Sequence, residues 1–382
     1  MVTKMKTKKE ILILGKSLGG GGSEVAMIEF INHLDFERFN VTLLLMDKDD
    51  EYKYKLKKKP IIKYIKYKNS TVKSLVSMYS FPAKVIKKLH LNTFFNIYDF
   101  VLKNSYASLR KEYDIALDFY GYGSFSTAFI SKKVHAKKKG MWIHDSKMPW
   151  IKNVIKYLND YDRFFCVSNS VKRTFCNKFL SLSKRARVFY NYVDTEEITT
   201  ASKQESNILF SKGILNIVTV GRLTEQKGYD VAIDTAKILK EKDIPFKWYV
   251  IGDGKDKHKL QKKIDKLNLN NNFFLLGRRN NPYPLMKNCS LYVQPSRHEG
   301  FGLTVFEARI LGKIVVASDI PEFKEQIVDG YDGVISKLDS EEIAKNIIML
   351  WNNKSLMEKL EKNLTILEKN FKNSTKIQDI FN

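Results

Sequence analysis

Two glutamates, Glu299 and Glu307, flank a short glycine-containing loop in the sequence RHEGFGLTVFEA of residues 297–308. The residues from Thr304 to Gly312 have the pattern of a helix that stops at a glycine. Backbone amides at the start of such a helix attract anions, so we expect a phosphate site with both carboxylates facing one ligand. Two simpler interpretations stay open. Thr304 and Glu307 have the spacing of a capping box, and Glu299 could be a solvated loop carboxylate.

Two cations follow the apolar segment NIVTV, in the sequence GRLTEQKG of residues 221–228. The apolar segment is typical of a buried strand, which places Arg222 and Lys227 at a strand end in the same half of the chain as the glutamates. Two fixed cations near a helix start suit a diphosphate. Ordinary loop charge is the alternative interpretation.

A histidine ends another apolar segment, in the sequence MWIHDSKMPW of residues 141–150. A lone histidine is more often structural than catalytic. Its position at a strand end makes His144 a candidate, because ligands bind at this edge of α/β sheets.

A glycine run lies between the first expected strand and helix, in the sequence KSLGGGGSE of residues 16–24. It is neither a Walker motif nor a dinucleotide fingerprint, because Glu10 and Glu24 stand where those motifs need glycine. Ser23 could cap the following helix. A turn of this kind lets backbone amides approach a phosphate or a hydroxyl-rich ligand, although a flexible surface turn is the alternative. The glycines concerned are Gly20, Gly21 and Gly22.

Alternating strand and helix patterns must position these residues. Continuous apolar runs predict buried parallel strands, and apolar residues at helical spacing predict the helices between them. The expected strands cover 10–15, 41–46, 115–120, 138–144, 163–168, 186–191, 216–223, 246–254, 272–277, 290–296 and 313–318, of which 216–223 and 246–254 include the turn that follows the strand. The expected helices cover 23–34, 230–241, 257–268, 304–312 and 341–353, with further helix toward the C-terminus.

Two strand series of this kind predict an α/β protein with two Rossmann-like, doubly wound domains. The polar segment of residues 194–213 is the expected linker. It divides the chain into residues 1–200 and residues 201–382. Two such domains leave a cleft between their strand ends, where a ligand would bind.

Composition narrows the class of protein. The 382 residues are 43% hydrophobic, and no run of about 18 apolar residues predicts a membrane-spanning helix. The short apolar run near the N-terminus leads into glycines, so we interpret it as a strand and not as a signal peptide. Three cysteines without CxxC spacing fit a reduced cytoplasmic protein without a zinc site.

The net charge is +24, and lysines are densest in KYKLKKKPIIKYIKYK of residues 53–68. Such a surface attracts nucleic acid, anionic lipid headgroups or phosphorylated substrates. Over residues 53–103, where lysines alternate with aromatic residues, a helix with a solvated face is one interpretation. A membrane-surface patch beside an acceptor groove is the other.

These motifs together resemble the retaining glycosyltransferases of family 4, which have the GT-B fold. In the second half the resemblance rests on GRLTEQKG, YVIGDG, NFFLLG and PSRHEGFGLTVFEARILGKIVVASDIPEFKEQI. In the first half GGGGSE, WIHD, CVSNSV and YNYVD match more loosely but in order. The glutamate pair with seven residues between its members is the signature of the family.

The resemblance implies a role for each candidate in the second half. Arg222 and Lys227 would bind the donor diphosphate, and Glu307 would accept hydrogen bonds from the ribose. Glu299 would lie beside the donor sugar. The backbone amides of Phe301, Gly302 and Leu303 would hold sugar hydroxyls and the diphosphate, and the segment around Gly277 and Arg278 would line the nucleobase.

In the first half, the resemblance implies that Gly20, Gly21 and Gly22 close over the diphosphate and the acceptor. His144 would contact the donor sugar. The family fold also implies a C-terminal helix that crosses back to the N-terminal domain. In this family the departing phosphate helps to take the acceptor's proton, so neither a protein nucleophile nor a metal is expected. The nucleotide-sugar is a co-substrate, and no cofactor is expected.

The chain departs from the family pattern at two places. Arg309 and Ile310 replace a small alanine-glycine run after the second glutamate, which should change packing and not chemistry. Ile320, Pro321 and Glu322 replace a glycine pair before the last glutamate. This change could reshape the donor-side loop, so the identity of the sugar is not inherited from the resemblance.

We therefore expect a retaining, metal-independent glycosyltransferase that uses a nucleotide-sugar, with UDP-sugars favoured. The expected acceptor is a glycan, lipid-linked or polymer acceptor in bacterial surface polysaccharide synthesis, such as capsule or teichoic acid. The expected location is the cytoplasm, peripherally on the anionic inner face of the membrane, with no nucleic-acid partner. The alternatives are a basic nucleic-acid- or membrane-binding protein and a sugar-nucleotide epimerase or phosphorylase on a related fold.

Overall fold

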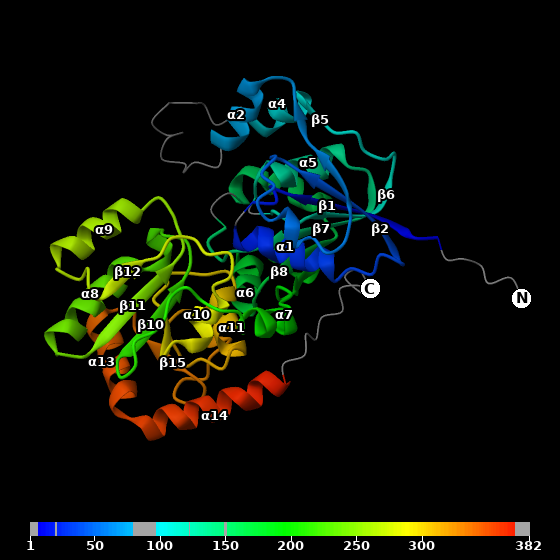
Figure 1. The fold of residues 1–382 in the computed structure, drawn as a ribbon. Coiled ribbons are helices and arrows are strands. Elements are labelled where there is room, and N and C mark those ends of the chain that lie inside the picture. The colour runs from blue at the N-terminus through cyan, green and yellow to red at the C-terminus, as the bar shows by residue number, and fades with distance from the viewer. Residues whose placement is uncertain (1–6, 20, 79–96, 122, 149–150, 371–382) are drawn as a thin grey trace, which may run out of the picture. The chain divides into compact units, whose positions relative to one another are not determined.

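A computed structural model describes residues 7–19, 21–78, 97–121, 123–148 and 151–370. The chain divides into two compact units, with the boundary between Tyr192 and Val193 (Figure 1). The division expected after residue 200 therefore falls inside the second unit. Among the described residues, no helix combines the length and the apolar composition needed to cross a bilayer.

The start of the expected linker is a helix. Asp194 caps α7 (Thr195–Ala201) by accepting a hydrogen bond of 2.9 Å from the Glu197 amide. The helix packs against α10 (Tyr283–Asn288) and α11 (Leu303–Ile310) of the second unit. A capped polar segment with one face to bury forms a helix here even though its composition is typical of a linker.

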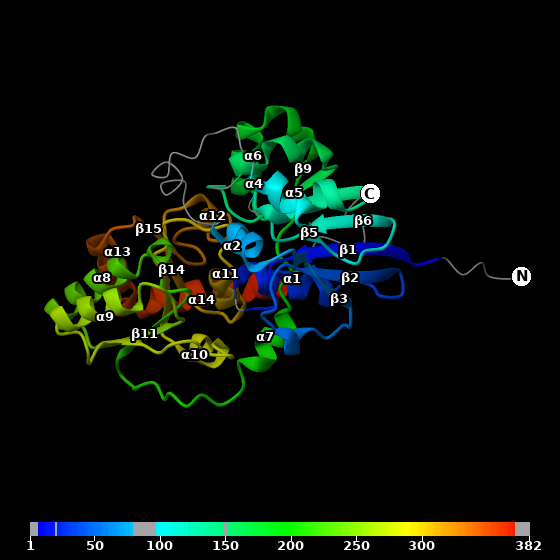
Figure 2. The same cartoon turned by 90° about the horizontal axis from the view of Figure 1, so that it is seen from above.

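The first unit is built on a sheet of seven parallel strands in the order β3-β2-β1-β6-β7-β8-β9. The strands are β1 (Lys9–Gly15), β2 (Phe39–Leu45), β3 (Ile61–Tyr64), β6 (Tyr113–Asp118), β7 (Ala136–Ile143), β8 (Arg163–Cys166) and β9 (Ala186–Val188). Figure 2 shows β1, β2 and β3 side by side. Most of the expected strands of this half are confirmed, because their apolar runs are buried on both faces of the sheet.

Helices and short 3-10 segments connect these strands. The helices are α1 (Gly22–Asn32), α2 (Ser70–Met78), α4 (Ile97–Lys103), α5 (Phe125–Lys133) and α6 (Asn169–Lys178). The 3-10 segments are η1 (Lys53–Lys55), η2 (Ile151–Asp160) and η3 (Leu180–Arg185), and a small antiparallel pair joins β4 (Lys66–Tyr67) to β5 (Ser105–Tyr106).

Aromatic residues form the centre of the first unit. Phe30 of α1 lies 5.2 Å from Trp142 and 5.4 Å from Phe119, measured between ring centroids. Trp142 stacks on Phe119 at 4.5 Å and packs against Phe165 at 4.6 Å. This cluster fixes α1, and with it the glycine run, against the middle of the sheet.

The helical interpretation of residues 53–103 is confirmed at α2 and α4 but is wrong at residues 61–64 and 66–67, which form β3 and β4. The β-branched residues of β3 pair it with β2. Residues 79–96 of the same region lie outside the described residues. One expected cap is also wrong. Ser23 does not cap α1, because the helix already begins at Gly22 and the Ser23 hydroxyl donates to the Glu24 carboxylate at 2.8 Å.

The second unit is built on six parallel strands in the order β12-β11-β10-β13-β14-β15. The strands are β10 (Leu215–Val220), β11 (Phe246–Ile251), β12 (Phe273–Leu275), β13 (Leu291–Gln294), β14 (Val315–Ser318) and β15 (Val334–Ser336). The remaining elements are η4 (Glu225–Lys227), α8 (Tyr229–Glu241), α9 (Lys257–Lys266), α12 (Pro321–Lys324), α13 (Ser340–Asn352) and α14 (Lys354–Asn370).

Helices cover both faces of this sheet. In Figures 1 and 2, α8, α9 and α13 lie on one face, and α10 and α11 lie on the other. Trp248 is fully buried in the core under α8, and its indole nitrogen donates to Thr219 at 3.0 Å. The α14 helix packs on α13 and α11. The expected return of the C-terminal helix to the first domain concerns residues 371–382, which lie outside the described residues.

The strand order reverses direction at one place in each sheet. In the first unit the chain passes from β1 outward to β3 and resumes on the other side of β1 with β6. In the second unit the same reversal separates β10 from β13. Loops diverge at such a switch point and leave a crevice at the carboxyl ends of the strands, where ligands of doubly wound folds bind.

A buried ion pair anchors the far end of α11. The Arg309 guanidinium donates to Asp332 at 2.9 Å, and the two side chains are 10% and 2% exposed. The other Asp332 oxygen accepts a hydrogen bond of 2.8 Å from the Val328 amide. The departure from the family pattern at Arg309 is therefore a packing feature, as expected.

We predict that Arg309→Met lowers the free energy of unfolding by about 3–5 kcal/mol, because it leaves the Asp332 carboxylate buried without its cation. The double variant Arg309→Met/Asp332→Asn should recover most of this loss, since asparagine still accepts from Val328. Urea unfolding of the three proteins measures both effects. A loss below about 1 kcal/mol in the single variant would contradict the pairing.

Candidate functional site

Four candidate residues of the second unit come from the two chain segments that leave its switch point, between β10 and β13. The loop after β10 carries Arg222 and leads through η4 to Lys227. The loop after β13 carries Glu299 and leads into α11 with Glu307. Because β10 and β13 are paired parallel neighbours, both loops leave the same edge of the sheet.

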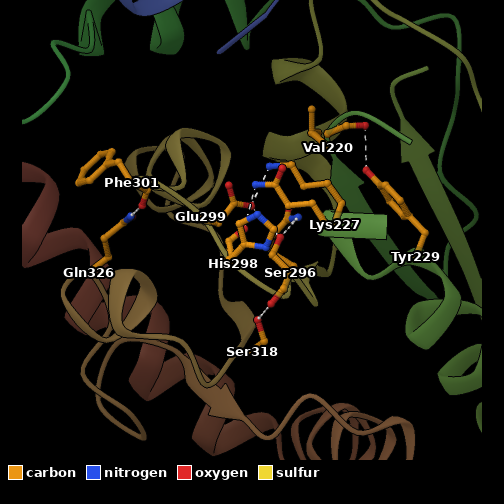
Figure 3. A network of polar contacts seen from close by, with 12 residues as sticks. Val220, Lys227, Tyr229, Ser296, His298, Glu299, Phe301, Ser318 and Gln326 are labelled. Carbon is orange, nitrogen blue, oxygen red and sulfur yellow. Dashed lines mark hydrogen bonds and ion pairs between the residues drawn. The ribbon is translucent and has the colours of Figure 1, made fainter. Parts of the chain in front are cut away.

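An ion pair between Lys227 and Glu299 joins the two loops. Lys227 Nζ donates to Glu299 Oε1 at 2.7 Å, and the side chains are only 13% and 7% exposed (Figure 3). The Ser296 hydroxyl donates to the same oxygen at 2.7 Å. The interpretation of Glu299 as a solvated loop carboxylate is therefore wrong. Its second oxygen, Oε2, accepts no hydrogen bond from the described residues and can accept one from a ligand.

A series of buried hydrogen bonds leads from the core of the second unit to the Glu299 carboxylate and fixes its orientation. The Tyr292 hydroxyl donates to Gln294 at 2.9 Å, and the Gln294 amide donates to the Ser296 hydroxyl at 2.9 Å. The Ser318 hydroxyl donates to the Ser296 carbonyl at 2.5 Å. Each member of the chain is almost wholly buried. Burial raises the pKa of Tyr292, which keeps its hydroxyl protonated as a donor.

Arg297 fastens the two loops together. Its guanidinium donates to both carboxylate oxygens of Asp230, at 2.8 and 2.7 Å, and to the Glu225 carbonyl at 2.8 Å. Its backbone amide donates to the Gln226 carbonyl at 2.7 Å. Hydrogen bonding to Arg297 lowers the pKa of Asp230. Sequence reasoning missed this pair, because no motif relates a residue inside PSRHEG to one just after GRLTEQKG.

Two glycines permit the close approach of these loops. Gly228 has a φ of +69°, and a Cβ atom there would lie 1.8 Å from the Pro295 carbonyl oxygen. Gly302 has a φ of +85°, and a Cβ atom there would lie 2.6 Å from the Phe323 ring. The Gln326 side chain also donates to the Phe301 carbonyl. The residues around α12, where the chain departs from the family pattern, therefore shape the loop before α11.

The start of α11 is open to an anion. The N-cap is Gly302, which has no side chain to bond the first amides. The amides of Gly302 and Leu303 donate to no group among the described residues. The capping-box interpretation of Thr304 and Glu307 is wrong, because both residues lie inside the helix. The Tyr283 hydroxyl donates weakly to Glu307, at 3.4 Å.

The two arginine candidates follow β10 and β12, which are separated in the sheet by β11. Arg222 follows β10, and its guanidinium is exposed. Arg278 follows β12, where the Gly252 amide donates to the Gly277 carbonyl at 2.9 Å and ties this segment to the end of β11. Both cations belong to the same edge of the sheet as Lys227.

The first unit places its glycine candidates at its own switch point. Gly21, between β1 and α1, is the N-cap residue, Gly22 is the first residue of α1, and no side chain caps the helix. Gly20 lies outside the described residues. These glycines follow the central strand β1, next to the end of β6.

His144 follows β7 and is buried. Its Nε2 lies 2.6 Å from the Phe119 carbonyl, to which the neutral imidazole donates. Burial lowers the pKa of His144 to about 4, so the ring is uncharged at neutral pH. Nearby, Asp118 at the end of β6 accepts hydrogen bonds from the Gly121 amide and the Thr127 hydroxyl. Burial raises the pKa of Asp118 to about 6.

Comparison with known proteins places this arrangement in a family. Residues 20–197 match the family described as Glycosyltransferase Family 4, and residues 202–365 match Glycosyl transferases group 1. Together the two matches cover most of the chain.

Among curated proteins, an uncharacterized glycosyltransferase of Methanocaldococcus jannaschii is 34% identical over 60% of this chain and 63% of its own length. The poly(ribitol-phosphate) alpha-N-acetylglucosaminyltransferase of Staphylococcus aureus is 30% identical over 61% of this chain and 47% of its own length. The chain thus spans about half to just under two thirds of these relatives.

Solved structures share the fold over nearly the whole chain. HepE of Anabaena with UDP-glucose has a TM-score of 0.72 at 20% identity, covering 97% of this chain and 98% of its own. TarM of S. aureus has a TM-score of 0.69 at 15% identity, covering 99% and 98%. These likenesses agree with the two doubly wound domains described above.

His144 and Asp118 should change the stability of the first unit with pH in opposite directions. An unfolded histidine has a pKa of about 6.5, so the stability that neutral His144 contributes is complete above that pH and is lost as the pH falls toward 4. The stability contributed by protonated Asp118 is complete below about pH 4 and is lost as the pH rises through 6.

We predict that the stability difference between the wild type and His144→Asn shrinks by about 3 kcal/mol from pH 7 to pH 4. The matched variant Asp118→Asn should give the opposite trend. Urea unfolding at several pH values measures both. A difference for His144→Asn that is constant over this range would show that the imidazole is not held neutral.

Proposed function

The chain belongs to the GT-B glycosyltransferases of family 4, and from that membership we propose that it transfers a hexose or N-acetylhexosamine from a nucleotide-sugar with retention of configuration. The observation that carries the proposal is the buried ion pair of Lys227 and Glu299 beside the uncapped start of α11. This arrangement offers a cation, a carboxylate oxygen and helix amides to one ligand.

The donor diphosphate would be held by Lys227, Arg222 and the first amides of α11. A lysine ammonium has three donors, of which one goes to Glu299, so the others remain for phosphate oxygens. Breaking the bond between sugar and phosphate builds negative charge on the leaving diphosphate. Fixed cations and amides stabilise that charge where it develops, without reorganisation.

The carboxylates of Glu299 and Glu307 would bind the sugar and the ribose of the nucleotide-sugar. Glu299 Oε2 would accept from the sugar hydroxyls, because Oε1 is occupied by Lys227 and Ser296. Glu307, at mid-length on α11, would accept from the ribose hydroxyls. The segment of Gly277 and Arg278 would line the nucleobase.

The first unit would supply the remaining contacts. Gly20, Gly21 and Gly22 would approach the diphosphate and the acceptor, and His144 would contact the donor sugar as a neutral hydrogen-bonding group. In this mechanism the departing phosphate takes the acceptor's proton. Arg222 and Lys227 provide the positive charge, so the transfer needs neither a protein nucleophile nor a metal.

UDP-sugars are the favoured donors. Crystal structures show HepE in complex with UDP-glucose and a TarM variant in complex with UDP, so this fold binds the nucleotide in both proteins. The nucleotide-sugar is the only small-molecule partner in the proposal, and no further cofactor takes part.

The acceptor would be a glycan, lipid-linked or polymer acceptor of bacterial surface polysaccharide synthesis, such as capsule or teichoic acid. One relative acts on poly(ribitol-phosphate), and another, from Campylobacter jejuni, acts on a diphospho-undecaprenol-linked sugar. The lysine-rich segment of residues 53–68 would hold the enzyme on the anionic inner face of the membrane, in the cytoplasm, without binding nucleic acid.

We test the donor site with UDP and uridine as probes, by calorimetry in EDTA. Lys227→Met should weaken UDP binding about 10- to 100-fold, because it removes a charged hydrogen bond, and should leave uridine binding unchanged. Glu307→Ala should weaken both ligands, because both contain the ribose. Lys345→Met, at an exposed lysine of α13, is the matched control and should change neither.

A panel of UDP-, GDP- and ADP-sugars then identifies the donor by hydrolysis and binding. Unchanged UDP binding by Lys227→Met would contradict the diphosphate role. Absence of binding by any nucleotide-sugar would contradict the function.

A further inference from the structure

The first unit holds a cavity at the carboxyl ends of β2 and β3. Its volume is about 330 Å³, and it lies between these strand ends and the start of α2. The residues that give it its chemistry are Lys48, Tyr64, Tyr67, Asn69, Ser70 and Lys73. All belong to one unit and to the described residues.

The lining of this cavity is cationic. Lys48 and Lys73 line it, and no carboxylate does. Lys73 lies 3.3 Å from Asp47, which holds it in place from outside the lining. Lys48 lies over the Tyr64 ring at 5.5 Å and forms no ion pair with the described residues. One of the two ammonium groups is therefore not neutralised by a carboxylate.

Of the other polar lining groups, the Tyr64 hydroxyl donates weakly to Asp50 at 3.4 Å, and the remaining three offer hydrogen-bond donors. Asn69 Oδ1 accepts from the Val72 amide at 2.9 Å, which leaves the Asn69 NH₂ to the cavity. The hydroxyls of Tyr67 and Ser70 donate to no group among the described residues. Burial raises the pKa of Tyr67, so its hydroxyl stays protonated. Asp47 and Asp50 lie behind Lys73 and Tyr64, outside the lining. A hollow lined by two ammonium groups and several hydrogen-bond donors, and by no carboxylate, matches an oxyanion better than a neutral or cationic ligand.

The cavity is connected to the glycine run of the first unit. The Leu18 amide donates to the Asp49 carbonyl at 2.8 Å, and the Tyr52 amide donates to the Leu18 carbonyl at 2.7 Å. The segment that follows β2 thus contacts both the glycine run and the cavity. A ligand group bound in the cavity would lie on the same sheet edge as the residues proposed to meet the acceptor.

We propose that this cavity is an acceptor subsite that binds a phosphoryl or carboxylate group carried by the acceptor, through Lys48, Lys73 and the Tyr67 hydroxyl. This proposal rests on the proposed function, because it names the chemical class of the acceptor that the enzyme would use. The nucleotide-sugar does not bind in this subsite.

The test uses fragments as probes: glycerol 1-phosphate for a phosphoryl group, glucuronate for a carboxylate, and glycerol and glucose as neutral controls. Binding to the full chain is followed by ligand-observed NMR and calorimetry. We expect one of the anionic fragments to bind and the neutral ones not to. Lys48→Met should weaken binding at least 10-fold, and Tyr67→Phe about 3- to 10-fold. Which fragment binds decides between phosphoryl and carboxylate acceptors.

The matched control is Lys59→Met, which removes an exposed lysine of the same basic segment outside the cavity. It should bind the fragments as the wild type does, and all variants should keep the wild-type thermal midpoint and UDP affinity. Failure of both anionic fragments to bind would overturn the proposal. An equal loss in Lys59→Met would overturn it too, because a general basic surface would then explain the binding. Fragment binding without UDP binding would contradict the donor site alone and leave this subsite standing.

Discussion

The buried ion pair of Lys227 and Glu299 is the contact on which the site depends. Each charge would be costly to bury alone, and each is stabilised by the other and by the hydrogen bonds around Glu299. The pair also joins the loop after β10 to the loop after β13. The remaining N–H groups of the Lys227 ammonium and the second carboxylate oxygen of Glu299 are the groups that can bind a nucleotide-sugar. The Lys227–Glu299 ion pair thus holds the two loops together and still has hydrogen-bonding groups for a ligand.

The rest of the second unit positions this pair. Parallel pairing of β10 with β13 brings the two loops to one edge, and the clamp of Arg297 on Asp230 fixes their spacing. Gly228 and Gly302 allow backbones to approach where a side chain would collide. The Arg309–Asp332 pair anchors α11 at its other end. The first unit likewise has a ligand-binding edge at its switch point, where the glycine run follows the central strand β1. It also has a cationic cavity at the carboxyl ends of β2 and β3.

Much of this architecture was predictable from the sequence, because continuous apolar runs such as those of β1, β7 and β11 admit few alternatives to a buried parallel strand. The strand-end positions of Arg222, Lys227 and Glu299 followed from the same pattern. The pairing of Lys227 with Glu299 did not, since each residue was assigned separately to a ligand and no local rule relates them. Ser23 and Thr304 are not caps because a glycine two positions earlier occupies the N-cap in each helix. The strand β3 was missed because it has only four residues and lies within a lysine-rich segment, which is typical of a solvated surface.

A crystal structure of the chain with UDP tests the central claim most directly. The account predicts a phosphate oxygen within about 2.7–3.2 Å of Lys227 Nζ, with Lys227 still bonded to Glu299 and the diphosphate at the start of α11. A diphosphate bound elsewhere, or one that contacts α11 while Lys227 makes no contact with it, would contradict the assignment of the ion pair to the donor site.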